Sequence, residues 1–192
     1  MINFIEQQIK ESSDIKKAIY TDLKLVKLIK KVSKKTIKAY KNGNKTLIAG
    51  NGGSAGDAQH ISAEFVGRFA FDRDPLPSIA LTTDSSILTA VGNDYGYKDI
   101  FARQIEANGI KGDIFIAIST SGNSKNIIKA IKRAKLKGII TVGLTNSNGG
   151  KMKDLSDYCI CVPSENTARV QEAHIMIGHI ICAIVEEKLF VE

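Results

Sequence analysis

The sequence predicts an α/β fold, in which a central parallel sheet carries helices on both faces and further helices precede it. Short apolar runs of strand type alternate with amphipathic helical runs from residue 46 onward. One of these runs, Ile114–Ile118, is continuously apolar, as are strands buried on both faces, and Ile139–Leu144 is expected to be another buried strand. The length of 192 residues fits one domain. We expect residues 1–45 to form a helical segment and residues 46–192 the α/β core.

Charge and composition narrow the class of protein. The formal net charge is +7, and the first 45 residues carry twelve lysines against four acidic residues. This segment is more simply explained as solvated lysine faces of helices than as a surface for nucleic acid or an anionic membrane. Three cysteines fit reduced thiols. There is no signal-peptide pattern and no run of eighteen apolar residues, so we expect a cytoplasmic protein without membrane contact.

The N-terminal segment predicts two amphipathic helices, because apolar residues recur at helical spacing through it. The second helix should end at the stop signal Asn42–Asn44, which contains Gly43. These helices place much apolar surface outside the α/β core. We therefore expect them to pack against another subunit as well.

A glycine turn after the first strand is the first candidate site element. The strand Thr46–Ala49 leads into a turn with three glycines and then a helix, which Ser54 or Asp57 is expected to cap. A helix N-terminus attracts anions, above all phosphate. His60 and Glu64 lie four residues apart and hence on one face of that helix. Considered alone, His60 is equally well explained as a histidine satisfied by backbone.

The rest of the chain continues the alternation, with Gly, Pro and Asn-Gly signals between elements. The connection of parallel strands through helices places ligands beyond the carboxyl ends of the strands. The expected elements are a strand at 78–81, a helix capped at Asp84, a helix at 98–107, a strand at 114–118, a helix at 125–137, a strand at 139–144, a short helix at 151–155, a strand at 158–162 and a last helix at 167–189.

A serine-rich loop forms the second site element. Residues 119–124 carry four hydroxyls, on Ser119, Thr120, Ser121 and Ser124, between a buried strand and a helix. Hydroxyls and helix-terminal N–H groups together make a neutral phosphate cradle. An ordinary capping turn is the alternative, and the position at the carboxyl end of a strand favours phosphate.

The last helix supplies the third element. Gln171 and His179 are eight residues apart, about 80° around the helix, so both can face one pocket. With His60 and Glu64 they would make a mixed nitrogen and oxygen ligand set suited to zinc. His174, in the same apolar run, is the more probable structural histidine by this reasoning, because a buried imidazole needs one fixed partner.

Four runs of this chain resemble the phosphoheptose isomerases (sedoheptulose-7-phosphate isomerases) of the sugar isomerase (SIS) domain class. They are GNGGSAGDAQHISAEFVGRF, VGNDYGY, STSGNS and NTARVQEAHIMIGHI, in the order and spacing of that family over nearly the whole chain. The resemblance implies a three-layer, flavodoxin/Rossmann-like SIS domain. It also implies a cytoplasmic homotetramer with active sites shared between subunits. The implied reaction converts sedoheptulose 7-phosphate to D-glycero-D-manno-heptose 7-phosphate, the first step toward the heptose of lipopolysaccharide core or capsule.

The resemblance also implies roles for individual residues. Glu64 and His179 would be the acid–base pair, and one Zn²⁺ per subunit would be held by His60, Glu64, Gln171 and His179. The expected substrate contacts are Asn51, Gly52, Gly53, Ser54, Glu64, Asn93, Asp94, Ser119, Thr120, Ser121, Ser124 and Gln171. Ala168 replaces an acidic residue of some relatives. Two alternatives remain: a non-catalytic SIS regulator that binds a sugar phosphate or a replication-initiator protein, and an isomerase for another sugar phosphate.

Overall fold

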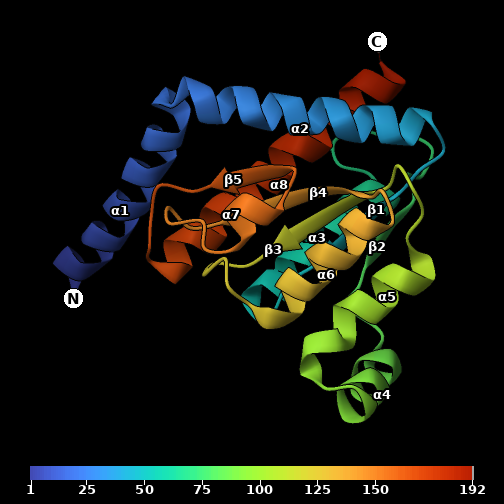
Figure 1. The fold of residues 1–192 in the computed structure, drawn as a ribbon. Coiled ribbons are helices and arrows are strands. Elements are labelled where there is room, and N and C mark those ends of the chain that lie inside the picture. The colour runs from blue at the N-terminus through green and yellow to red at the C-terminus, as the bar shows by residue number, and fades with distance from the viewer. Residues whose placement is uncertain (192) are drawn as a thin grey trace.

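The computed structural model describes residues 1–191 and confirms the three-layer α/β fold (Figure 1). Residue 192, the end of the expected domain, lies outside the described residues. Five parallel strands form one sheet in the order β2-β1-β3-β4-β5. The strands are β1 (Thr46–Ala49), β2 (Ser78–Ala80), β3 (Ile114–Ile118), β4 (Ile140–Thr145) and β5 (Tyr158–Cys161). Each lies within one residue of its expected position.

The helices cover both faces of this sheet. One face carries α2 (Leu23–Lys41), α3 (Gly53–Val66) and α8 (Thr167–Phe190), and the other carries α5 (Ile100–Asn108), α6 (Lys125–Leu136) and α7 (Met152–Leu155). The first helix, α1 (Ile2–Thr21), packs on α8 and α2. A further helix, α4 (Ser85–Asp94), and the 3₁₀ helix η1 (Tyr97–Asp99) precede α5. Among residues 1–191, no helix is both long and apolar enough to cross a membrane.

Strand β3 shows how the sequence divides two hydrophobic cores. Ile114, Ile116 and Ile118 belong to the core beneath α2, α3 and α8, whereas Phe115 and Ala117 belong to the core beneath α5, α6 and α7. All five side chains are buried. A strand with alternate residues facing two apolar layers must be apolar throughout. This explains the uninterrupted apolar run that marks β3 in the sequence.

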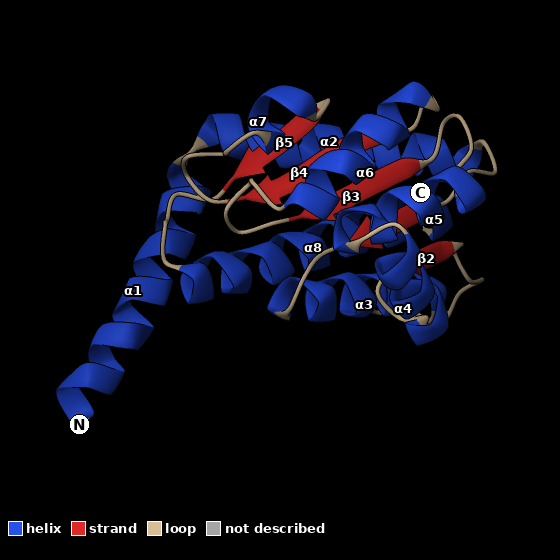
Figure 2. Cartoon of the chain, turned by 60° about the horizontal axis from the view of Figure 1, so that its bottom comes forward, coloured by secondary structure: helices blue, strands red, loops and turns tan. Residues whose placement is uncertain are grey.

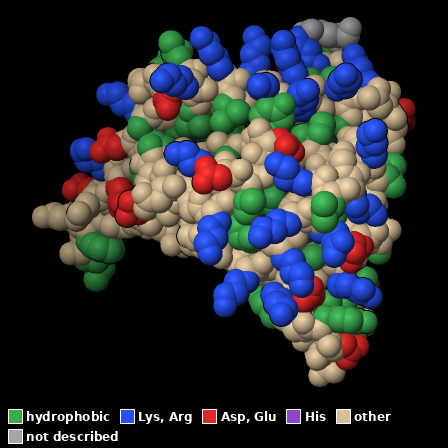
Figure 3. All heavy atoms as spheres, viewed as in Figure 1, with side chains coloured by type: hydrophobic (Ala, Val, Ile, Leu, Met, Phe, Trp, Pro, Cys, Tyr) green, Lys and Arg blue, Asp and Glu red, His purple; other side chains and the backbone are tan. Residues whose placement is uncertain are grey.

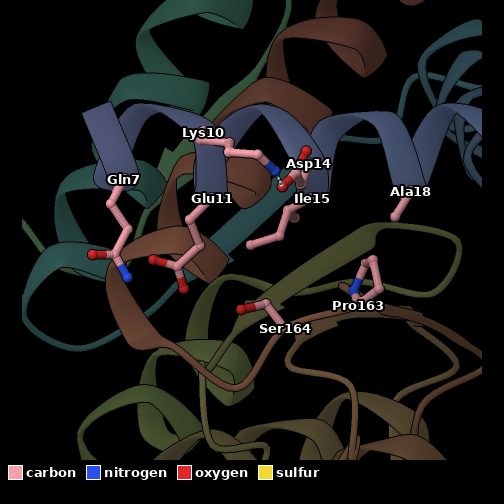
Figure 4. Close-up of a pocket in the computed structure, with 8 residues that line it drawn as sticks. All are labelled: Gln7, Lys10, Glu11, Asp14, Ile15, Ala18, Pro163 and Ser164. Carbon is pink, nitrogen blue, oxygen red and sulfur yellow. Dashed lines mark hydrogen bonds and ion pairs between the residues drawn. The ribbon is translucent and has the colours of Figure 1, made fainter. Parts of the chain in front are cut away.

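Helix α1 extends away from the body of the molecule (Figures 1 and 2). Its inner side is fastened to the start of α8, where the Arg169 guanidinium donates to the Gln8 carbonyl over 2.6 Å and the Asn166 amide donates to Glu11 over 3.2 Å. Between α1 and the loop at Pro163 and Ser164 there is a hollow lined by both polar and apolar side chains (Figure 4). None of the residues that line this hollow belongs to the expected site.

A buried ion pair joins the ends of α3 and α8. The Glu186 carboxylate accepts hydrogen bonds from the backbone N–H groups of Phe69 and Ala70, at 2.8 and 2.7 Å, and from Arg73 Nε at 3.0 Å. Arg73 also donates to the carbonyls of Phe65 and Glu64. Both charged side chains are almost fully buried, 2% and 1% exposed. The pair therefore fixes the backbone where α3 ends, including Glu64.

This environment changes the acidity of Glu186. Burial alone raises the pKa of the carboxyl, but the hydrogen bonds from Phe69, Ala70 and Arg73 outweigh burial and hold the pKa below its usual range. The folded-state pKa is depressed, so the stabilisation is present above the unfolded value and is lost as the pH falls through the folded one.

We predict that Glu186→Gln lowers the free energy of unfolding at pH 7 by about 3–5 kcal/mol, because the Arg73 charge stays buried without its partner. Urea unfolding measures this loss. The variant should also show a shallower fall in stability than the wild type below about pH 4, where the wild-type carboxylate gains its proton.

The exposed neighbour offers a matched control, since Glu187→Gln should change stability by no more than about 0.5 kcal/mol. A Glu186→Gln variant as stable as the control would show that the buried pair does not stabilise the fold.

Candidate active site

The two expected site loops lie side by side because they follow neighbouring strands. β1 and β3 are adjacent in the sheet, with Ala49 opposite Ala117. The glycine turn follows β1, and the serine loop, residues 119–124, follows β3. The Asn51 and Asn126 side chains connect them through two hydrogen bonds, of 3.0 and 2.8 Å. Both loops therefore open at the carboxyl edge of the sheet, where parallel α/β proteins bind ligands.

The glycine turn is shaped by contacts that exclude side chains. A Cβ on Gly50 would lie 2.3 Å from the Ser54 carbonyl oxygen. Gly52 has a φ of +56° and is the residue that precedes α3. The expected cap by Ser54 or Asp57 is wrong: no side chain caps α3, Ser54 is buried within its first turn and Asp57 lies in its second. The Ser54 and Ala55 N–H groups donate to the carbonyls of Asn51 and Gly52, both over 3.0 Å, so of the first N–H groups of α3 it is that of Gly53 that is left for a ligand.

In the serine loop, three hydroxyls gather at one place. Ser119 Oγ lies 2.9 Å from Ser124 Oγ and 3.4 Å from Ser121 Oγ. Ser124 precedes α6 without capping it through its side chain. Thr120 is half-buried beside Ser119. Clustered hydroxyls at an uncapped helix N-terminus form the kind of neutral cradle that holds a phosphate.

A pair of glycines sets the shape of the serine loop. Gly122 has a φ of +65°, and a Cβ there would come within 2.1 Å of the Gly149 carbonyl oxygen. Gly150 has a φ of +53° and meets the backbone of Gly122 from the other side. The serine loop thus rests directly on the loop that follows β4, backbone against backbone.

Two histidines and a glutamate meet between α3 and α8. His60 Nε2 lies 3.0 Å from Glu64 Oε1 and 3.2 Å from His179 Nε2. The ligand atoms of the three side chains all lie within 4.8 Å of one another. The His60 and His179 rings make an edge contact, and the Phe69 ring also packs against His179. The structure thus brings together three of the four expected zinc ligands from positions far apart in the sequence.

The fourth expected ligand, Gln171, lies elsewhere within this chain. Its amide packs against Gly53, where a Cβ would be 2.6 Å from Nε2 and 2.8 Å from Oε1. Gln171 precedes His179 by eight residues, so it lies about 12 Å back along α8 at 1.5 Å per residue. Gln171 is therefore placed at the glycine turn, against Gly53, and the histidine cluster lies further along the same two helices.

Two expected substrate contacts, Asn93 and Asp94, lie at the end of α4, and two further ionisable groups, Asp57 and His174, lie on α3 and α8. Asn93 and Asp94 end α4, are exposed and bond to each other over 2.9 Å. Burial raises the pKa of Asp57 to about 6, and the nearby His60 opposes this rise. His174 is fully buried and its Nε2 bonds the Thr145 carbonyl, which confirms its structural role, and burial lowers its pKa to about 4.

Sequence reasoning missed two residues that the structure links to the turn. Asn126 is buried at the start of α6 and pairs with Asn51, and the Tyr97 hydroxyl donates to Asn51 Oδ1 over 3.0 Å. A signal for Asn126 was present, since it is a polar residue at an otherwise apolar position of α6, directly after the serine loop. Tyr97 closes the run VGNDYGY but carries no periodicity that distinguishes it.

Comparison with known proteins extends over nearly the whole chain. A SIS domain family model matches residues 8–146. The phosphoheptose isomerase of Aneurinibacillus thermoaerophilus is 63% identical over 190 residues, which are 99% of this chain and 96% of the relative. Phosphoheptose isomerase 2 of Campylobacter jejuni is 63% identical over 188 residues, 98% of this chain and 94% of the relative.

A solved structure agrees with these relatives. The phosphoheptose isomerase from Francisella tularensis superposes with a TM-score of 0.93 at 36% identity and covers 97% of this chain and 98% of its own. The fold, the two loops and the histidine cluster thus occur in a chain whose sequence and structure both match one group of enzymes. The chain belongs to the phosphoheptose isomerases, a family of isomerases within the SIS domain class.

Proposed function

We propose that this chain is an aldose–ketose isomerase that converts sedoheptulose 7-phosphate to D-glycero-D-manno-heptose 7-phosphate. The reaction would begin the synthesis of heptose for lipopolysaccharide core, lipooligosaccharide or capsule. The observation that carries the proposal is the meeting of Glu64 and His179 on the same two helices that border the glycine turn. The regulator alternative is not favoured, because a protein that only binds sugar phosphates has no need of this acid–base pair.

The size of the substrate supports this assignment. His60 follows Gly53 by seven residues, so the cluster lies about 10 Å along α3 from the glycine turn. An extended seven-carbon chain with a terminal phosphate spans about the same length, at roughly 1.2 Å per backbone bond. A phosphate held by Ser119, Ser121 and Ser124 would then leave the C1–C2 end near Glu64 and His179. Asn93, Asp94 and Gln171 would contact the sugar between these ends.

The proposed chemistry is a pair of proton transfers. Glu64 removes a proton from C1 of the ketose, and electrons move to make an enediolate across C1 and C2. His179 transfers the hydroxyl proton from O1 to O2, and C2 then gains the proton that C1 lost. The backbone of Glu64 is held by Arg73, which keeps the base on the substrate side of α3.

The three converging side chains also fit a metal ion. His60, Glu64 and His179 place two imidazole nitrogens and a carboxylate oxygen around one point, a donor set that Zn²⁺ prefers. Three protein ligands leave an open position, as in catalytic zinc sites. Bound there, Zn²⁺ would supply positive charge against the enediolate. Gln171 could join this set only from another copy of the chain, since its own α8 holds it at the glycine turn.

Assembly into a homotetramer is the second part of the proposal. An apolar groove of about 540 Å³ runs between α1, α2 and α8 and is lined by Ile19, Tyr20, Val26, Ile29, Met176, Ile180 and Ile184, with lysines at its rim. Phe4, Ile5 and Ile9 of the projecting α1 are exposed as well. Single exposed apolar residues are ordinary, but a continuous groove of this kind is typical of a subunit interface.

Lysines gather along the outer side of α2 (Figure 3). We assign this lysine-rich face to contact with solvent and not with nucleic acid. We place the protein in the cytoplasm.

We predict that purified protein isomerises sedoheptulose 7-phosphate and that Glu64→Gln lowers kcat by at least ~10²-fold, because the amide keeps the shape and loses the base. Ser121→Ala should raise KM and change kcat little, since a phosphate contact acts on ground state and transition state alike. Steady-state kinetics with both variants separates these effects. Near-normal kcat in a folded Glu64→Gln variant would exclude Glu64 as the base and leave His179 to be tested.

We predict about one zinc ion per chain in protein purified without added metal, measured by elemental analysis. His60→Ala should remove most of it, whereas Gln59→Ala, on the exposed neighbour, should leave the content unchanged. Full turnover in protein stripped by a chelator would remove the ion from the mechanism while leaving the acid–base pair in place.

We predict four chains per particle by light scattering at micromolar concentration. Val26→Asp places a charge in the apolar groove and should produce smaller species. Leu136→Asp, on an exposed leucine of α6 outside the groove, is the matched control and should remain a tetramer. A wild-type chain that is active as a monomer would contradict the proposed assembly.

A further inference from the structure

We infer that Asn126 is a positioning residue, which holds the Asn51 amide so that it presents an N–H donor to an oxygen of the bound sugar phosphate. The inference rests on the proposed function, because it assigns a role within that same site. Asn126 is only 3% exposed, so we assign its effect to the residue that it holds.

The backbone sets the orientation of the Asn126 amide. The Ile127 N–H lies 2.9 Å from Asn126 Oδ1, and a backbone N–H can only donate. The atom facing Ile127 must therefore be the oxygen, which leaves Nδ2 of Asn126 directed at Asn51 over 2.8 Å. One peptide group thus decides which way this side chain points.

The Asn126 amide in turn sets Asn51. Nδ2 of Asn126 needs an acceptor, so Asn51 must place Oδ1 opposite it, and Asn51 Nδ2 then donates to Asn126 Oδ1 over 3.0 Å. The Tyr97 hydroxyl donates to Asn51 Oδ1 from the other side over 3.0 Å. Both lone pairs of this oxygen are then used.

What remains on Asn51 is a single donor. Its Nδ2 carries two hydrogens, of which one bonds Asn126 and the other has no partner among residues 1–191. A reciprocal amide pair uses the hydrogen nearest the carbonyl, so the free hydrogen points away from Asn126. Asn51 belongs to the glycine turn, and its side chain reaches Asn126 directly after the serine loop. The free hydrogen therefore selects an oxygen acceptor at this point of the site.

The decisive experiment is a double-mutant cycle on turnover. Asn126→Asp keeps the size of the side chain but sets an oxygen against Asn51 Oδ1, which breaks the pair. We expect kcat/KM to fall about 10- to 100-fold, mainly through KM, as for one lost hydrogen bond to substrate. Asn51→Ala should cost a similar factor, and the double variant should be no worse than Asn51→Ala alone. Losses that multiply would assign Asn126 a merely structural role and overturn the inference.

A second variant decides the matter if Asn126→Asp does not fold. Tyr97 is 65% exposed, so Tyr97→Phe removes one hydroxyl without disturbing the core. We expect a loss of about 3- to 10-fold in kcat/KM that disappears in the Asn51→Ala background. Tyr95→Phe is the control, because that exposed tyrosine contacts Arg103 through its ring, which phenylalanine keeps. Tyr97→Phe within twofold of the wild type would overturn the inference.

A further readout does not depend on the reaction. The side-chain NH₂ hydrogens of Asn126 should exchange with D₂O at least about 10-fold more slowly than those of the exposed Asn148. Slow exchange in a protein that does not isomerise sedoheptulose 7-phosphate would refute the proposed function and keep the amide pair. Equal exchange in an active enzyme would refute the pair alone.

Discussion

The close packing of α3 against α8 is the constraint on which the site depends. The two helices run in the same direction, and Gly178 lies so near Ile61 that a Cβ there would be 2.6 Å from its Cδ1. Gly53 lets the Gln171 amide approach α3 in the same way. This closeness allows His179 to reach His60, 119 residues away in sequence. A helix pair spaced by larger side chains would keep the two imidazoles apart.

The ends of this helix pair are held by different means. At the start of α3 no side chain caps the helix, the Gly53 N–H is left open and the turn is shaped by glycines, an arrangement suited to a ligand. At the far end, the buried Arg73 and Glu186 satisfy the backbone of residues 64–70. The end of α3 that is suited to bind a ligand and the end whose backbone is held rigidly are therefore opposite ends of the same helix. Glu64 lies at the rigid end, as a base with a fixed position requires.

Most of the fold was accessible from the sequence because its signals are local. The apolar runs, the cap at Asp84 and the serine loop each depend on a few consecutive residues, and their positions agree with the structure. Three features could not be placed from the sequence. Helical spacing allowed Gln171 and His179 to share a pocket, but only the packing on Gly53 shows that Gln171 turns to the other end. Ser54 is a residue type that often caps a helix, but α3 already begins at Gly53, so Ser54 lies inside the first turn and is buried. The pairing of Asn126 with Asn51 joins residues 75 positions apart, for which no periodicity exists.

The backbone contact between Gly122 and the Gly149–Gly150 turn makes two loops a single block. Met152 N–H bonds the Gly122 carbonyl, and Lys151 N–H bonds the Asn123 side chain, so the joint is also closed by hydrogen bonds. A change of length in either loop would move the other. Efforts to retune this enzyme for sugars with shorter or longer carbon chains would therefore have to exchange both loops together. In a library that randomises the serine loop alone, most variants would lose the contact between this loop and the Gly149–Gly150 turn.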